Sequence, residues 1–298
     1  MTKIVTVLTV LITLGSIPFV FAASHNDDKL EFAGTLEETL GHFWALEQNL
    51  DEENAELALI HATHPIAELY DTMSMHLEDN PEFDAKLKET LLDLQNKANT
   101  EVSREDAQTA IDKAKEIISE ARMIVVGEDL SNDSTFKIQL INQLLETAKV
   151  EYQEAVSDGI IGEMAEFQDG SAFVWRSQQI LDTISDLENQ AVDDIESKYD
   201  DLWAIFDSRA DPSAMKSITD EIISEFVEIS GVESKESEHM METFGQLPPL
   251  QQVKEGIAPE DVECKSGFEL IFKASVGSPA CVSPATATKL VALGWASA

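Results

Sequence analysis

The chain has 298 residues, with 20 lysines and arginines against 57 aspartates and glutamates, and a net charge of −37. A charge of this sign repels nucleic acid and anionic membrane surfaces and concentrates cations, so we exclude nucleic-acid binding. Solvated helix faces produce the same composition, and charge alone therefore does not identify a metal-binding protein. A hydrophobic content of 43% with only 13 glycines and 9 prolines favours long helices and one large or two modest domains.

The first 22 residues are organised like a secretory signal peptide. Lys3 precedes an apolar run that breaks at Gly15, and a short stretch ending in Ala22 offers a small-residue cleavage site. We expect cleavage after Ala22 or Ala23, which removes Lys3 and takes the net charge from −37 to −38. No later segment reaches the roughly 18 apolar residues of a membrane span, so we expect a secreted or extracytoplasmic (pseudo-periplasmic) protein without one.

From Thr35 to Gly231, apolar residues recur at the three- to four-residue spacing of amphipathic helices. The alternation of apolar and polar residues that is typical of strands is missing there. The pattern predicts an all-α, mostly antiparallel multi-helix bundle over residues 30–231, divisible into two four-helix halves. Turn and capping residues place eight helices at 35–49, 54–77, 81–98, 103–126, 134–158, 163–187, 191–208 and 213–229.

The composition changes after Gly231. Residues 232–257 read as a linker, and residues 258–298 predict a small α+β C-terminal module with a hairpin from Phe268–Ala274 and Ala280–Val282 and a closing helix. Cys264 and Cys281 are the two cysteines of a chain predicted to be secreted, so we expect a disulfide between them. Closing a loop of about 18 residues is worth roughly 3 kcal/mol in the chain-entropy model, and a unit this small needs that support.

The helix predicted over 54–77 holds three of the six histidines, and two of them lie on one stripe with a carboxylate. His61, His64 and Glu68 follow one another at i, i+3 and i+7, which is a set of metal ligands facing one way. Pro65 should kink this helix or restart it. One helix approaches an ion from one side only, so further ligands must come from neighbouring helices.

Glu47 is the first candidate for a further ligand. It follows Leu40 by seven residues on the apolar stripe of the first predicted helix, where a carboxylate needs a partner. The alternative is that Glu47 turns to the edge of the helix and meets water or a lysine. Both interpretations remain open at this point.

Glu151, Glu166 and Asp169 form a second candidate cluster, of acidic ligands. Glu166 and Asp169 share a stripe with Arg176, so a structural ion pair competes with the ligand role. Mixed imidazole and carboxylate ligands suit iron, copper or zinc ions. The sequence MSMH at 73–76 adds thioethers, which favour Cu(I), although methionine there also suits a hydrophobic core.

Two stretches resemble known proteins. Residues 144–174, with E-Y-x-E-A-V-x-D-G followed by E-[YF]-Q-D, resemble the extracytoplasmic helical extension of some iron permease family members, although the permease's own membrane motif R-E-x-x-E is absent. Related periplasmic iron-uptake proteins carry H-x-x-E, and His64 to Glu68 is one residue longer.

The tail, with C-K-x-G-[FL]-x-L-I-[FV]-K, G-S-P-A-C-V and K-L-x-x-x-G-W, is similar to a module of exported proteins in ammonia-oxidising archaea. That resemblance implies an accessory or sorting role.

The sequence does not indicate an enzyme, because G-x-S-x-G, H-E-x-x-H and phosphate-binding loops are missing. We expect a non-catalytic extracytoplasmic accessory protein that binds iron or another transition metal for uptake or buffering. Its candidate partners are the ion and a membrane transporter or cell-surface protein. The alternative is an acidic structural or interaction protein of the cell exterior with no metal site.

Overall fold

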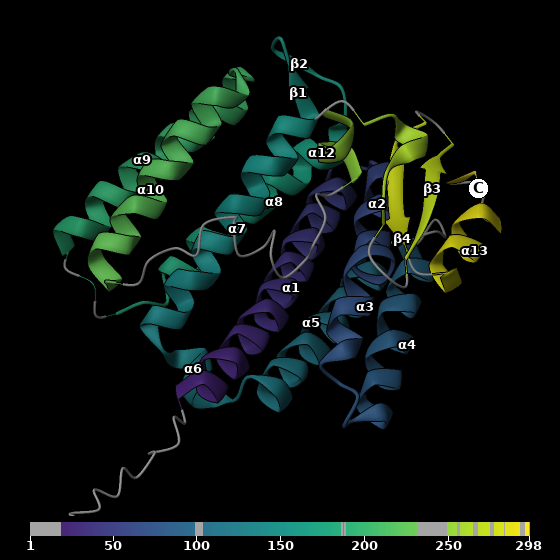
Figure 1. Cartoon of the computed structure of the whole chain (residues 1–298), viewed down its shortest axis with the longest axis horizontal. Coiled ribbons are helices and arrows are strands. Elements are labelled where there is room, and N and C mark those ends of the chain that lie inside the picture. Colours follow the sequence, from purple (N-terminus) through teal and green to yellow (C-terminus); the bar gives the residue numbers. More distant parts are fainter. Residues whose placement is uncertain are drawn as a thin grey trace, which may run out of the picture.

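A computed structural model describes residues 19–98, 104–185, 187, 189–231, 249–254, 257–264, 268–274, 277–282, 284–292 and 296–297. Most of the predicted signal peptide (1–22) and of the predicted linker (232–257) lies outside these residues. The fold is the expected all-α, mostly antiparallel bundle with a small C-terminal α+β module (Figure 1). Within the described ranges, no helix has the length and apolarity that crossing a membrane requires.

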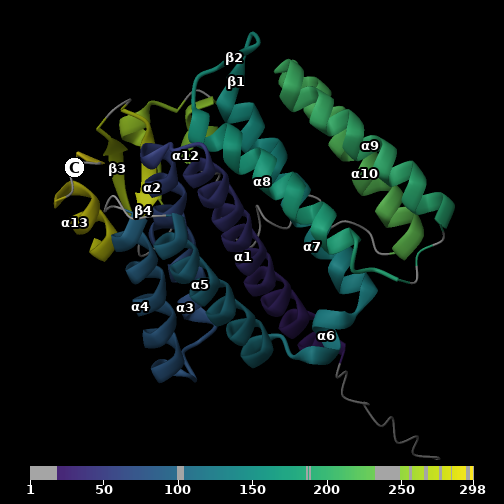
Figure 2. The same cartoon turned by 180° about the vertical axis from the view of Figure 1, so that it is seen from behind.

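Helix α1 (Phe19–Asp51) runs through the middle of the molecule. Figures 1 and 2 show α7 and α8 on one side of it and α2 to α5 on the other. The prediction that the first helix begins at Thr35 was wrong, because α1 begins at Phe19 and includes residues that we assigned to a polar leader. Those residues lack a clear 3.6-residue apolar period, and periodicity was the basis of the prediction.

The helix predicted over 54–77 is present as three consecutive segments. They are α2 (Ala55–His64), a π-helical turn (Pro65–Leu69) and α3 (Tyr70–Met75). Asn54 caps α2 by accepting a hydrogen bond from the Leu57 amide at 3.3 Å. Helices α4 (Pro81–Ala98) and α5 (Arg104–Val125) follow and pack against each other.

The second half of the bundle contains α6 (Glu128–Asn132), α7 (Ser134–Ala155), α8 (Met164–Leu181), α9 (Asn189–Ser208) and α10 (Pro212–Ser230). Asp133 caps α7 by accepting from the Phe136 amide at 2.8 Å. A short antiparallel hairpin, β1 (Val156–Ser157) and β2 (Ile160–Ile161), joins α7 to α8. We had expected this segment to hold the end of a helix and a plain turn, and that prediction was wrong.

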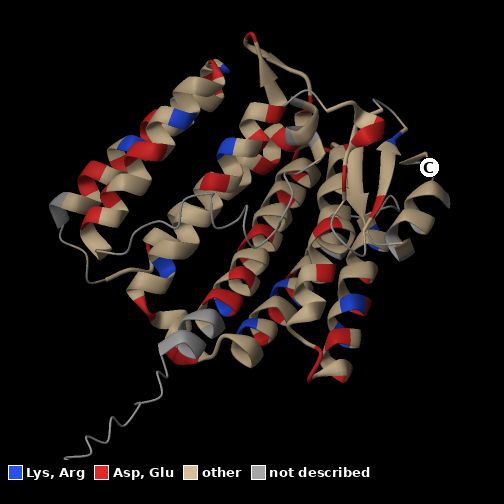
Figure 3. Ribbon diagram, viewed as in Figure 1, with Lys and Arg blue, Asp and Glu red and all other residues tan. Residues whose placement is uncertain are grey.

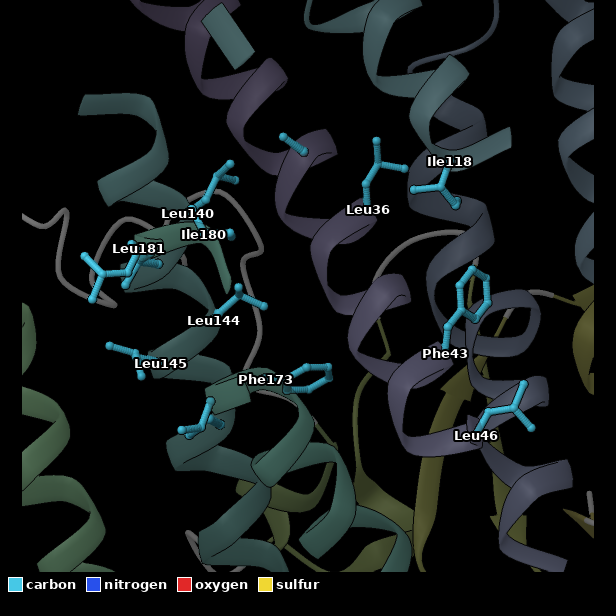
Figure 4. Packing of buried hydrophobic residues seen from close by; sticks show 14 of the residues in the cluster. Leu36, Phe43, Leu46, Ile118, Leu140, Leu144, Leu145, Phe173, Ile180 and Leu181 are labelled. Carbon is cyan, nitrogen blue, oxygen red and sulfur yellow. The ribbon is translucent and has the colours of Figure 1, made fainter. Parts of the chain in front are cut away.

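The hydrophobic core is continuous across the bundle. In Figure 4, Phe173 points from α8 toward α1, and the α1 side chains Leu36, Phe43 and Leu46 lie on the other side of that helix. All four are 2% exposed or less. Helix α1 therefore contributes to packing on both sides, which fixes its position between the two halves.

The C-terminal module has its own small core. Strand β3 (Glu269–Lys273) pairs antiparallel with β4 (Pro279–Val282) and β5 (Ala296–Ser297), and α13 (Pro284–Ala292) covers them. Short helices α12 (Pro249–Lys254) and η2 (Pro259–Asp261) precede the sheet. The disulfide Cys264–Cys281 is present, which confirms the predicted pairing. The predicted hairpin and closing helix are confirmed as well.

Acidic side chains are spread over every long helix of the bundle, as Figure 3 shows. Glu37 on α1 and Asp169 on α8 are buried instead; Glu37 is 3% exposed and is held by Arg122 of α5 and Arg176 of α8. The predicted pairing of Arg176 with Glu166 or Asp169 was therefore wrong. Arg176 reaches Glu37 on a helix that is distant in sequence, and Asp169 is left without an arginine.

Candidate metal centre

Three histidines and one aspartate meet inside the bundle, between its two halves. His42 comes from α1, His61 and His64 from α2, and Asp169 from α8. All four side chains are buried, and one ligand atom from each lies within 4.8 Å of the others. Among the described residues, no other group of three or more His, Cys, Asp or Glu side chains converges in this way.

Asp169 is the centre of the group. Its Oδ1 lies 2.7 Å from Nδ1 of His42 and 3.1 Å from Nδ1 of His61. Its Oδ2 lies 3.0 Å from Nδ1 of His64, in hydrogen-bond geometry. Three imidazoles on two helices thus surround one carboxylate on a third, and the Asp169 side chain is only 3% exposed.

Three atoms of this group are buried without a hydrogen-bond partner among the described residues. They are Nδ1 of His42, Nδ1 of His61 and Oδ1 of Asp169. Their separations are short, but the direction of the ring nitrogens does not allow a hydrogen bond to Oδ1. A buried polar atom left in this state costs about 1–3 kcal/mol, and an atom that lacks a partner needs another species, such as a cation, to satisfy it.

Two glycines next to the ligands let the helices approach closely. A Cβ on Gly41 would lie 2.8 Å from Cδ1 of Phe173, so α1 can touch α8 only because residue 41 has no side chain. A Cβ on Gly170 would lie 3.2 Å from the carbonyl oxygen of Ala148 on α7. These contacts set the spacing that brings His42 to Asp169.

Glu68 lies at the outer side of the group. Its Oε1 is 3.9 Å from Nε2 of His64, and its side chain is 48% exposed while that of His64 is 6% exposed. The π-helical turn between them closes an i→i+5 ring, which holds one residue more than an α-turn. His64 and Glu68 are four residues apart, and the two side chains remain on the same side of the helix through this turn.

The charges of the group depend on each other. Burial disfavours a charge on His64, but the carboxylates of Glu68 and Asp169 outweigh burial and raise the pKa of His64 to about 10. Burial also disfavours the Asp169 carboxylate, but the imidazoles of His42 and His64 hold the pKa of Asp169 well below its usual range. The metal-free centre therefore contains an aspartate anion and a His64 imidazolium at neutral pH.

Further acids surround the centre. Burial raises the pKa of Glu38 on α1 to about 7, although Thr147 donates a hydrogen bond to it. Burial and the charges of Glu166 and Asp169 raise the pKa of Glu151 well above its usual value. Glu166 itself forms an ion pair with Lys273, with Oε1 and Nζ 3.0 Å apart. Glu151 and Glu166 are thus electrostatic neighbours of Asp169, but neither belongs to the group of converging ligand atoms, and a second acidic ligand cluster stays a prediction.

The structure does not bring Glu47 to the centre. Its carboxylate accepts hydrogen bonds from Lys115 of α5 at 2.9 and 3.0 Å and from Gln108 at 2.8 Å. The MSMH segment is also elsewhere: Met73 is fully buried in the core, Met75 is 58% exposed, and His76 faces Glu31 at 3.8 Å. Neither set joins the three histidines.

Sequence analysis missed His42. It lies outside the apolar stripe of α1, between two other polar residues on the same side, Glu38 at i−4 and Asn49 at i+7. Such a polar stripe on a helix that is otherwise buried was the available sign of a site. Periodicity could not show that this stripe faces His61 and Asp169.

One region of the chain matches a known family of protein domains. Residues 127–233, which include α6 to α10, match the iron permease-associated 4-helix bundle domain. The matched region is less than half of the chain and contains Asp169, whereas His42, His61 and His64 lie outside it. The chain matches no curated protein and no solved structure. The candidate metal centre thus lies between the region that matches the iron permease-associated bundle domain and the helices that precede it.

Proposed function

We propose that this protein is a non-catalytic, extracytoplasmic metal-binding accessory protein for the uptake or buffering of iron. His42, His61, His64 and Asp169 would bind the ion. The observation that carries the proposal is the set of three buried, converging atoms without hydrogen-bond partners, Nδ1 of His42, Nδ1 of His61 and Oδ1 of Asp169. A cation between them would satisfy all three at once.

The spacing supports a single first-row ion. Two ligand atoms that are each about 2.1 Å from one ion can be at most about 4.2 Å apart. The four ligand atoms lie within 4.8 Å of one another, whereas those of a tetrahedral site with bonds of about 2.1 Å are about 3.4 Å apart, so binding requires the widest separations to contract by up to about 1.4 Å. Three nitrogens and one oxygen suit Fe²⁺, Zn²⁺ or Cu²⁺, and the match to an iron permease-associated domain favours iron.

The same domain match suggests a partner. A membrane transporter of the iron permease kind is the partner we propose, with this protein delivering or holding its ion on the extracytoplasmic side. The carboxylates of Glu68 and Glu166 would attract cations toward the buried ligands, and a bound cation would in turn favour the charged forms of Glu38 and Glu151, whose pKa values are raised by burial.

One observation favours the alternative, an acidic structural protein with no metal. The His64 imidazolium already donates a hydrogen bond to Asp169, which compensates part of the cost of burying that carboxylate. In that case the cluster stabilises the interface between the two halves of the bundle. The two functions differ in whether the native protein contains metal.

The test is elemental analysis of natively purified protein, followed by titration of the apoprotein with Fe²⁺, Zn²⁺ and Cu²⁺ against a competing chelator. We expect one ion per chain in the wild type and none in Asp169→Asn or His61→Gln. His76→Gln is the matched control, because His76 is a histidine that faces a carboxylate outside the cluster. Weak, salt-sensitive binding that is equal in all four proteins would instead support the structural function.

A further inference from the structure

Two side-chain amides lie directly behind His61, on the side away from Asp169. Nε2 of His61 is 2.7 Å from Oε1 of Gln168 on α8. The same Oε1 accepts a hydrogen bond from Nδ2 of Asn49 on α1 at 2.9 Å, and Nε2 of Gln168 donates back to Oδ1 of Asn49 at 3.3 Å. His61 is fully buried and Asn49 is 1% exposed, so solvent does not supply alternative partners.

The direction of these hydrogen bonds is fixed by the backbone. Nδ2 of Asn49 also donates to the carbonyl oxygen of Ala45 at 2.8 Å, and a carbonyl oxygen can only accept. The Asn49 amide therefore has one orientation, in which its NH₂ group also faces Gln168. That NH₂ group donates a hydrogen bond to Oε1 of Gln168. The same oxygen can only accept, so Nε2 of His61 must donate the second hydrogen bond to it.

We infer that Asn49 and Gln168 are positioning residues that hold His61 in the Nε2–H tautomer, with Nδ1 directed at Asp169 and the centre of the cluster. The hydrogen on Nε2 follows from the hydrogen bonds, while the use of Nδ1 as a metal ligand rests on the proposed function. Nδ1 of His61 is 3.1 Å from Oδ1 of Asp169, and neither atom has a hydrogen-bond partner among the described residues.

This arrangement leaves Nδ1 of His61 as the ring nitrogen that a cation can bind. With Nδ1 protonated, His61 would have a hydrogen at the nitrogen nearest Asp169 and would need to lose it before binding an ion. The amide pair disfavours the Nδ1–H tautomer, because that tautomer would leave Oε1 of Gln168 facing a nitrogen without a hydrogen. Partners that orient a ligating histidine typically account for about 10- to 100-fold in metal affinity.

The first experiment reads the tautomer in the metal-free protein. Long-range ¹H–¹⁵N spectra at pH 7.5 separate Nε2–H, Nδ1–H and imidazolium forms, and loss of a signal in His61→Gln assigns His61. We expect the Nε2–H form in the wild type and in Gln168→Glu, which keeps an acceptor oxygen behind the ring. Gln168→Leu removes the acceptor and should give Nδ1–H or a mixture. Gln178→Leu is the matched control, since it removes a single hydrogen bond, to Trp203, from the same helix.

The second experiment measures Zn²⁺ affinity of the same proteins by chelator competition. We expect Gln168→Leu to bind about 10- to 100-fold more weakly than wild type, with Gln168→Glu and Gln178→Leu showing no such loss. An Nδ1–H or imidazolium His61 in the wild type, or unchanged tautomer and affinity in Gln168→Leu, would overturn the inference. A wild type that binds no metal but shows the Nε2–H tautomer would instead refute only the proposed function.

Discussion

In the metal-free protein, His64 is held as an imidazolium by the carboxylates around it. Its Nδ1 donates to Asp169 at 3.0 Å and its Nε2 faces Glu68 at 3.9 Å. Because its pKa is raised from 6.5 to about 10, the stabilisation it provides is complete below pH 6.5 and disappears as the pH rises through 10. A metal ion that binds His64 has to displace this proton.

We therefore expect metal binding at pH 7.5 to release at least one proton per ion. The apparent affinity should increase about tenfold per pH unit between pH 7 and 9, because the unprotonated form of His64 becomes more populated. Proton release is measured with an indicator dye in weak buffer during Zn²⁺ titration. His64→Gln should bind more weakly and release one proton fewer. Binding without any proton release would show that His64 is not a ligand.

The helix pair α1 and α8 sets the geometry of the centre at the level of elements. Gly41 allows Phe173 to pack on α1, and the Phe173 ring lies edge-on to the His42 ring, with centroids 5.3 Å apart. A methyl group on residue 41 would have to displace that ring or separate the helices. Either movement would disturb the 2.7 Å contact between His42 and Asp169.

Gly41→Ala should accordingly weaken Zn²⁺ binding by at least tenfold. Overpacking costs about 1–3 kcal/mol, and the better helix propensity of alanine returns at most about 1 kcal/mol. Gly34→Ala, two turns earlier on α1, is the matched control, because its methyl meets only the mobile end of the Gln143 side chain. It should retain affinity. Thermal unfolding and chelator competition measure both effects, and wild-type affinity in Gly41→Ala would show that this helix contact does not define the site.

Apolar periodicity with caps such as Asp133 was sufficient to predict most helices, and His61, His64 and Asp169 were recognised from residue type and spacing. Contacts between distant helices were out of reach. Glu47 has the partner that its place on an apolar stripe requires, but that partner is Lys115, which is 68 residues away in sequence. The same limitation concealed His42, whose role depends on where α8 packs.

The C-terminal module places a positive charge beside the candidate metal centre. Lys273 on β3 pairs with Glu166 on α8, and the charges of Glu166, Glu68 and Glu163 raise its pKa although burial opposes this. The disulfide Cys264–Cys281 ties the chain before β3 to β4, its neighbour in the sheet. The module thus presents a fixed ammonium group to the same acidic residues that would attract an ion.

This placement predicts that Lys273 weakens cation binding. Lys273→Gln should raise the Zn²⁺ affinity severalfold, on the order of 1 kcal/mol, because an incoming dication would no longer be repelled by the ammonium group and no positive charge would offset that of the Glu166 carboxylate. The gain should shrink as the salt concentration rises, since screening acts on partly exposed charges. Lys198→Gln, which breaks an ion pair with Glu225 between α9 and α10, is the control and should leave affinity unchanged. Equal or weaker binding by Lys273→Gln would mean that the module supports the site through packing, with its charge playing no part.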